Sequence, residues 1–250
     1  MISKTPRLWQ YNFSNYNEKA RWALDVKGIP HRRRTLMPGE PRAFLFSARG
    51  TLPILDIEGQ RYGDSTEIIA ALERIQPDPP LYPQDPELRE RALALEDHLD
   101  EETGHAMRRA LFWEVRDDRS YMVDFITQGQ PAPLRALMKA TFPVGWMYVR
   151  HRYAFAQDTA DAAWGEIEAA LDLIETERDG GPYLVGETFT VADLTASALL
   201  WPLAWPPEFP YELPAFPHSQ RLEQLRAHPA VAWIGGIYAR HRPPSAEILA

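Results

Sequence analysis

The segment from residue 50 to residue 73 constrains the fold of this chain more than any other part of the sequence. It reads GTLPILDIEGQRYGDSTEIIAALE, which predicts a strand entered through Pro53, a tight turn, a second strand, and a helix opened by Asp64 and Ser65. A strand edge beside Pro53 can pair its backbone with an extended peptide. The N-terminus of a helix that starts near Ser65 can hold a carboxylate. The segment therefore predicts a binding site for a small anionic peptide.

This segment resembles the glutathione-binding half of a glutathione transferase, and the residues that carry the resemblance are Gly50, Leu52, Pro53, Asp64 and Ser65. The resemblance implies that the peptide bond before Pro53 is cis and that the backbone of Leu52 pairs with the cysteinyl part of glutathione. It also implies that Asp64 and Ser65 hold the γ-glutamyl end. The same pair fits an ordinary helix cap, because DSTE reads as an acid-x-x-Glu capping box. The two roles are compatible, since a serine at a helix start can direct its amide toward a carboxylate.

Strand and helix patterns alternate through the first part of the chain. The expected elements are a strand at 8–11, a helix at 18–27, a strand at 31–36 parallel to the first, a helix at 40–48, strands at 53–57 and 61–63, and a closing helix that buries Ile68, Ile69, Leu72 and Ile75. The order β-α-β-α-β-β-α is that of a thioredoxin-like domain. The first part of the chain is therefore predicted to be an α/β unit.

A proline-rich stretch follows and marks a domain boundary. Residues 77–86 contain five prolines, so they cannot continue a helix and form a stiff connector. We expect a thioredoxin-like domain at 1–78, a linker at 79–86 and an all-helical domain at 87–250. The expected helices of the second domain are 88–116, 133–155, 159–178, 192–204, 219–226 and 230–241.

A helix-capping pattern in the second domain extends the resemblance. Thr190 stands three residues before Asp193 and ahead of an apolar run, which fixes a helix start. Together with YLVGE at 183–187, the pattern is similar to the capped buried helix in the all-helical domain of glutathione transferases. The resemblance to that family therefore covers nearly the full chain.

Composition excludes several classes of chemistry. The chain has no cysteine, which rules out disulfides, thiolate metal sites and the cysteine nucleophile of the reductase branches of the family. A net charge of −8 argues against a nucleic-acid partner. No histidine pair has metal-site spacing, so no metal is expected. The N-terminus lacks a secretory pattern and the most apolar run is short, so we expect a cytoplasmic protein without membrane segments.

The first turn of the expected α/β domain offers a residue for thiol chemistry. Glutathione reacts as its thiolate, so the protein must lower the pKa of the bound thiol. A hydroxyl that donates to sulfur at a helix N-terminus does this. Ser14 matches the activating serine in the serine-type classes of the family. Tyr11 and Tyr16 could instead supply a phenolic donor, Asn17 could donate an amide proton, and Ser14 could be a simple N-cap.

The second substrate is expected between this turn and the first long helix of the second domain. That helix offers Arg108, Phe112 and Trp113 as an acceptor site, although the same spacing is typical of any helix that packs in a bundle. The aromatic segments 117–155 and 201–217 depart from ordinary family members. Two interpretations are open: the aromatic side chains of these segments lie near the acceptor site or its lid, or they pack within a larger helical bundle.

The resemblance implies a glutathione transferase that conjugates the glutathione thiolate to a small hydrophobic electrophile. Glutathione would be its co-substrate, detoxification its role, and a homodimer its assembly. Two other functions use the same fold. One is a non-catalytic protein that binds glutathione or a hydrophobic ligand, and the other is a glutathione-dependent isomerase or dehalogenase.

Overall fold

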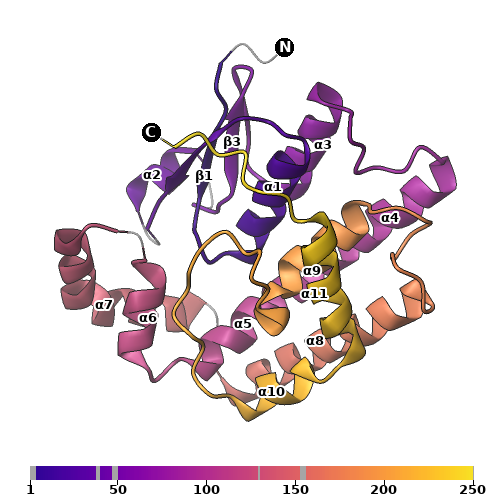
Figure 1. The fold of residues 1–250 in the computed structure, drawn as a ribbon. Coiled ribbons are helices and arrows are strands. Elements are labelled where there is room, and N and C mark those ends of the chain that lie inside the picture. The colour runs from indigo at the N-terminus through magenta and orange to yellow at the C-terminus, as the bar shows by residue number, and fades with distance from the viewer. Residues whose placement is uncertain (1–3, 38–39, 47–49, 129, 153–155, 250) are drawn as a thin grey trace.

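The chain forms a four-stranded mixed sheet followed by a helical body (Figure 1). The computed structural model describes residues 4–37, 40–46, 50–128, 130–152 and 156–249. The strands are β1 (Arg7–Gln10), β2 (Arg32–Thr35), β3 (Ile54–Ile57) and β4 (Gln60–Tyr62), in the order β2-β1-β3-β4. β1 pairs with β2 in parallel and with β3 antiparallel, and β3 pairs antiparallel with β4. The predicted parallel pairing of the first two strands is confirmed.

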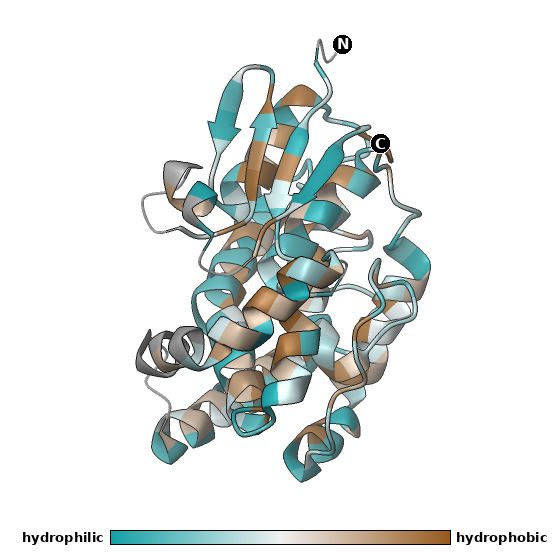
Figure 2. Ribbon diagram, turned by 90° about the vertical axis from the view of Figure 1, so that its left-hand side faces the viewer, coloured by the Kyte–Doolittle hydropathy of each residue, from teal (hydrophilic) through white to brown (hydrophobic). Residues whose placement is uncertain are grey.

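The interior of the sheet is apolar and its edges are polar. Leu8 on β1 lies opposite Leu55 on β3, and both side chains are fully buried. Figure 2 shows hydrophobic β3 between the more hydrophilic edge strands β2 and β4. The predicted turn at Glu58 and Gly59 joins β3 to β4, with φ angles of 49° and 78°. Two consecutive residues with positive φ match the backbone twist of a tight hairpin.

Three helices complete the first part of the chain: α1 (Asn15–Val26), α2 (Pro41–Phe46) and α3 (Ser65–Ile75). The order βαβαββα confirms the predicted thioredoxin-like fold. The predicted start of the first helix at residue 18 was wrong, because the helix begins at Asn15. Ser14 caps it by accepting a hydrogen bond from the Asn17 amide, so the polar run that suggested a loop supplies the cap. The last two residues of the helix predicted at 40–48 lie outside the described residues.

The second part of the chain is helical, as predicted. Its elements are α4 (Pro86–His98), η1 (Leu99–Thr103), α5 (Gly104–Glu114), α6 (Arg119–Ile126), α7 (Ala132–Arg152), α8 (Gln157–Arg178), α9 (Val191–Ala204), α10 (Gln220–Arg226) and α11 (Pro229–His241). The region 117–155 divides into two helices, and residues 153–155 lie outside the described residues. The linker at 79–86 stays a prediction as a domain boundary, although Pro86 already belongs to α4, whose N-cap is Asp85.

The helix predicted at 88–116 is not continuous. A π-helical segment, η1, separates α4 from α5, and the Gly104 amide donates to the Leu99 carbonyl five residues back. The carbonyl of Asp100, inside this segment, accepts a hydrogen bond from Tyr16. A π-turn of this kind frequently marks a functional position in a helix. The apolar periodicity of the sequence could not show it.

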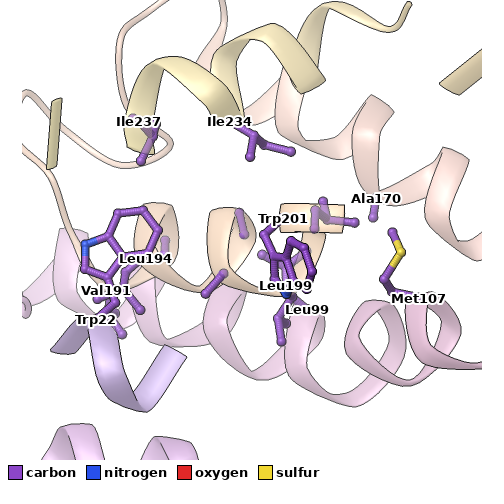
Figure 3. Close-up of a cluster of buried hydrophobic side chains, with 14 of the residues drawn as sticks. Trp22, Leu99, Met107, Ala170, Val191, Leu194, Leu199, Trp201, Ile234 and Ile237 are labelled. Atoms are coloured by element: carbon purple, nitrogen blue, oxygen red, sulfur yellow. The ribbon is translucent and has the colours of Figure 1, made fainter. Parts of the chain in front are cut away.

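Helix α9 is the centre of the helical body. All of its side chains from Val191 to Leu203 are buried, and it packs against α1, α4 and α11. Figure 3 shows Trp22 of α1 beside Val191 and Leu194, with Ile234 and Ile237 of α11 on the opposite side. The first helix of the sheet domain thus shares its core with the helical body.

The predicted capping box at the start of α9 is present. Asp193 accepts hydrogen bonds from the Thr190 amide and hydroxyl and from the Leu184 amide. Burial raises the pKa of Asp193 to about 6, and these hydrogen bonds oppose the rise. The box therefore fixes both the helix start and the preceding turn.

The C-terminal segment returns to the edge of the sheet beside β2 (Figure 1). The His31 amide donates to the Ala246 carbonyl at 3.3 Å, and the Ile248 amide donates to the His31 carbonyl at 2.7 Å. Behind this bridge, Arg242 pairs with Glu18 and Asp25, whose side chains are fully buried. The tail covers backbone groups that an edge strand would otherwise leave unpaired.

His31 is held neutral at this junction. Its imidazole is fully buried, and its Nε2 accepts a hydrogen bond from Arg33 Nε at 3.0 Å. Because a guanidinium can only donate, Nδ1 carries the proton and donates to the Ile29 carbonyl at 2.8 Å. The pKa of His31 is lowered to about 4, chiefly by burial, with the charges of Arg33 and Arg242 acting in the same direction and the Ile29 hydrogen bond and the charge of Asp25 opposing it.

Acidification should therefore destabilise the fold through His31. The folded pKa lies below the unfolded value of about 6.5, so this contribution is complete above pH ~6.5 and is lost as the pH falls toward the folded pKa. A shift of this size corresponds to roughly 3 kcal/mol. Urea unfolding measured from pH 7 to pH 4 should show that His31→Gln loses this pH dependence relative to the wild type. His218→Gln, which changes an exposed histidine, should keep it, and equal pH profiles for the wild type and His31→Gln would contradict the account. The comparison with a variant is needed because two other buried groups change stability with pH in the opposite direction. Burial raises the pKa values of Asp193 and Glu96, so these two carboxyl groups favour the folded state as the pH falls.

Candidate functional site

The turn that carries Ser14 is held from below by α1. Ser14 is half-buried, and its Oγ accepts the Asn17 amide at 3.4 Å. The Asn17 carboxamide oxygen accepts the Tyr11 amide at 3.2 Å. Arg21 Nη1 donates to the Tyr11 carbonyl at 3.1 Å, and Nη2 donates to the Asn12 carbonyl at 3.2 Å. Both the amide and the carbonyl of Tyr11 are thus fixed by side chains of α1.

The alternatives to Ser14 have different surroundings. Tyr16 Oη donates to the Asp100 carbonyl at 2.5 Å and lies 3.3 Å from His105 Nδ1. Burial, with the charge of Asp100, raises the pKa of Tyr16 well above its usual range, so its proton belongs to the contact with η1. Tyr11 stacks on Phe13. Asn17 is fully buried, and its Nδ2 has no hydrogen-bond partner among the described residues.

The peptide-pairing edge lies at the entry to β3. The Leu52–Pro53 peptide bond is cis. Leu52 is buried in a small apolar cluster with Trp9 and Ile54, and Tyr11 packs against that cluster. The entry to β3 and the turn before α1 are therefore neighbours at one end of the sheet.

The N-terminus of α3 carries an unused hydroxyl. Asp64 caps the helix by accepting the Thr66 amide at 2.8 Å. Ser65 follows with 1% of its surface exposed, and its Oγ has no partner within the described part of the chain. A buried hydroxyl without a partner costs free energy unless a ligand or water satisfies it. Ser65 is therefore a donor available to a ligand at a helix N-terminus.

A buried ion cluster lies directly beneath this position. Lys19 Nζ contacts Glu96 Oε1 at 2.8 Å, Asp100 Oδ2 at 2.5 Å and Thr66 Oγ1 at 3.0 Å. The side chains of Lys19 and Glu96 are fully buried. Burial raises the pKa of Glu96, and Lys19 opposes that rise. Within the described residues, Asp100 Oδ1 has no hydrogen-bond partner, so it is an acceptor available to a cation.

Sequence reasoning missed this cluster. Glu96 and Asp100 stand four residues apart, the spacing of one helix face, and that spacing was the available signal. Their partner Lys19 is distant in sequence, and only the packing of α1 against the helical body brings the charges together. The site therefore has one more feature than the predicted Leu52, Pro53, Asp64 and Ser65.

The arrangement suits a ligand with an amino-acid end. The α3 N-terminus and the Ser65 hydroxyl favour a carboxylate. Asp100 Oδ1 favours an ammonium group, and Thr66, which bonds Asp100 at 2.8 Å, ties the two positions together. A molecule that carries both groups on one carbon can satisfy the donor and the acceptor at once.

The three residues expected to bind the acceptor have different neighbours. Arg108 lies close enough to Tyr16 for its charge to lower the pKa of that phenol. Phe112 packs at the margin of a cluster built by α6 and α7. The Arg116 guanidinium lies 3.9 Å from the ring centroid of Trp113, so one ring face is covered. The acceptor role of Arg108, Phe112 and Trp113 stays a prediction.

Two hollows of about 610 Å³ each lie beside the segment 201–217. One is lined mainly by α9, α11 and Phe216, and the other by the aromatic and proline side chains from Trp201 to Leu213. Neither includes Ser14 or Ser65, so the polar chemistry and these hollows are separate. Among the described residues, no cluster of His, Cys, Asp or Glu could hold a metal ion, and no helix is long and apolar enough to cross a membrane.

A thioredoxin-like sheet domain followed by an all-helical domain has the architecture of the glutathione transferases. Residues 8–80 match the family model of the glutathione S-transferase N-terminal domain, and residues 137–226 match that of the C-terminal domain. This chain belongs to the glutathione S-transferase superfamily.

Individual proteins agree with this assignment. A stretch of 48 residues is 50% identical to the glutathione S-transferase-like protein LUC7 of Fusarium sp., and it covers 19% of this chain and 22% of that protein. The crystal structure of a glutathione S-transferase from Methylobacillus flagellatus KT with glutathione bound matches with a TM-score of 0.64 and 17% identity, over 94% of this chain and 95% of that one. The crystal structure of a glutathione S-transferase from Methylobacterium radiotolerans in complex with glutathione sulfonate matches with a TM-score of 0.61 and 23% identity, over 99% of both chains.

Gly104 should be essential to the contact between Tyr16 and η1. A Cβ at this position would lie 2.3 Å from Tyr16 Oη and 2.5 Å from its Cζ, and the ring cannot move without losing its bond to Asp100. Gly104→Ala should therefore lower the free energy of unfolding by about 1–3 kcal/mol, measured by urea denaturation. Gly165→Ala on α8, where nothing lies within 4 Å of the added methyl, should be neutral or slightly stabilising. Equal stability of the two variants would contradict this packing.

Proposed function

We propose that this protein is a glutathione transferase that conjugates the glutathione thiolate to a small hydrophobic electrophile. Two atoms carry the proposal, Ser65 Oγ at the N-terminus of α3 and Asp100 Oδ1 in η1, and neither has a hydrogen-bond partner among the described residues. Thr66, the residue after Ser65, connects the two positions through its hydrogen bond to Asp100 Oδ2. The γ-glutamyl end of glutathione has a carboxylate and an ammonium group on one carbon. This end satisfies both protein groups, which an ordinary carboxylic acid does not.

Ser14 is proposed as the residue that activates the thiol. With the γ-glutamyl end at Ser65 and the cysteinyl backbone paired with Leu52, as in the family, the sulfur points toward the turn before α1. Ser14 stands at the N-terminus of that helix, where the helix dipole favours an anion. Among the described residues, Ser14 Oγ acts only as an acceptor, toward the Asn17 amide, so its hydroxyl proton can be donated to the sulfur. Tyr16 is a weaker candidate, since its proton is already given to Asp100.

The chemistry needs only this thiolate and a reactive carbon. The thiol proton leaves to solvent, sulfur forms a bond to the electrophilic carbon, and a leaving group departs with its electron pair. The protein lowers the pKa of the thiol and orients the sulfur. We further propose a homodimer with a cytoplasmic role in detoxification, in keeping with the family.

Ser14→Ala should reduce kcat/KM for conjugation by on the order of 10² and leave the Kd for glutathione nearly unchanged. The matched control is Ser219→Ala, because Ser219 caps α10 in the same way, with Oγ accepting the Leu222 amide at 3.2 Å. Both variants lose one helix cap, at a cost of about 1 kcal/mol, and only Ser14→Ala should lose activity.

Unchanged turnover in Ser14→Ala would remove this residue from the role and direct attention to Asn17. Glutathione binding by the wild type without conjugation of any electrophile would favour the non-catalytic binding protein. Steady-state kinetics and calorimetric titration together separate these outcomes.

A further inference from the structure

Helix α6 reaches the turn that carries Ser14. Phe13, the residue directly before Ser14, has its ring centroid 4.8 Å from that of Phe125 on α6. The separation is within the range of favourable aromatic pairs. The segment 117–155, which departs from the ordinary pattern of the family, therefore contacts the residue that directly precedes Ser14.

Aromatic rings continue on both sides of this contact. Tyr11 stacks on Phe13 with centroids 5.8 Å apart and an interplanar angle of 7°. Phe125 stacks on Tyr121 at 5.6 Å and 22°. Tyr11, Phe13 and Phe125 are each half-buried residues, so none of them is sealed inside the core. We call these three residues the aromatic surface.

The segment 201–217 holds this surface in place. Tyr121 packs edge-on against Phe216 at 5.7 Å, and its hydroxyl donates to the Pro214 carbonyl at 3.5 Å. Earlier in the same segment, the hydroxyl of Tyr211 accepts a hydrogen bond from the side chain of Gln10, a fully buried residue at the end of β1. The segment contains six prolines, which limit its freedom to rearrange. The segment therefore contacts α6 at one end and the end of β1 at the other.

We infer that the aromatic surface binds the electrophile and that this electrophile is a flat aromatic molecule. The inference rests on the proposed function and narrows its substrate class. A sulfur beside Ser14 lies next to Phe13, so a carbon attacked by that sulfur is carried against Phe13 and Phe125. A flat aromatic ring gains binding free energy from stacking on these rings in addition to the burial of its apolar surface. An alkyl chain gains binding free energy only from the burial of its surface. The acceptor then contacts α6 rather than the face of α5 that carries Trp113.

The test measures binding of product analogues, so that it does not depend on turnover. Glutathione, S-benzylglutathione and S-hexylglutathione are titrated into the wild type, Phe125→Leu and Phe142→Leu. Leucine keeps an apolar side chain at residue 125 and removes the ring. Phe142 is a control from the same cluster, since it is buried on α7 and stacks on Trp146 rather than on Phe13.

The wild type and Phe142→Leu should bind the benzyl conjugate more tightly than the hexyl conjugate, and Phe125→Leu should lose that preference by about three- to tenfold. Glutathione itself should bind all three proteins equally. Binding of the three ligands without a benzyl preference, or with a preference that Phe125→Leu retains, overturns the inference and leaves the proposed function standing. Failure of the wild type to bind any of them overturns both.

Discussion

The buried ammonium group of Lys19 is the interaction on which the rest of the structure depends. Moving such a charge out of water costs several kcal/mol, and the cost is offset only if carboxylates meet it with good geometry. The carboxylates of Glu96 and Asp100 contact it from the helical body, and the hydroxyl of Thr66 on α3 accepts a further hydrogen bond from it. Three segments must therefore meet at one point. The position of the sheet domain on the helical body follows from this requirement and from the shared core around α9.

The same requirement prepares the site. Lys19 contacts one carboxylate oxygen of Asp100, and the other oxygen has no partner in the described residues. The Ser65 hydroxyl, one residue before the Thr66 that bonds Asp100, has no partner there either. The Asp100 carbonyl in η1 accepts the hydrogen bond of Tyr16. Two helix N-termini then remain for the ligand, that of α1 for the sulfur and that of α3 for a carboxylate. Both are positive ends of helix dipoles, which suits a peptide with two negative groups.

Local signals in the sequence were enough to predict most of the fold. The parallel strand pair, the Glu58–Gly59 turn, the helix start at Thr190 and the βαβαββα order all depend on residues close together in the chain. The errors came where a distant contact decided the outcome. The break at η1 carries a contact with Tyr16, 84 residues away, and the start of α1 depends on how Ser14 and Asn17 share hydrogen bonds. The ion cluster and the aromatic surface were missed for the same reason, since each joins side chains from separate elements that no periodicity brings together.

Ser65 and Asp100 are proposed to bind the amino-acid end of glutathione together. Calorimetric titration of the purified protein with glutathione, and with an analogue that lacks the γ-glutamyl amino group, tests this directly. The account predicts that the analogue binds about 10- to 100-fold more weakly, the size of one lost hydrogen bond between charged groups, and that Ser65→Ala weakens both ligands. Equal affinity for the two ligands, or no binding of glutathione, would contradict it.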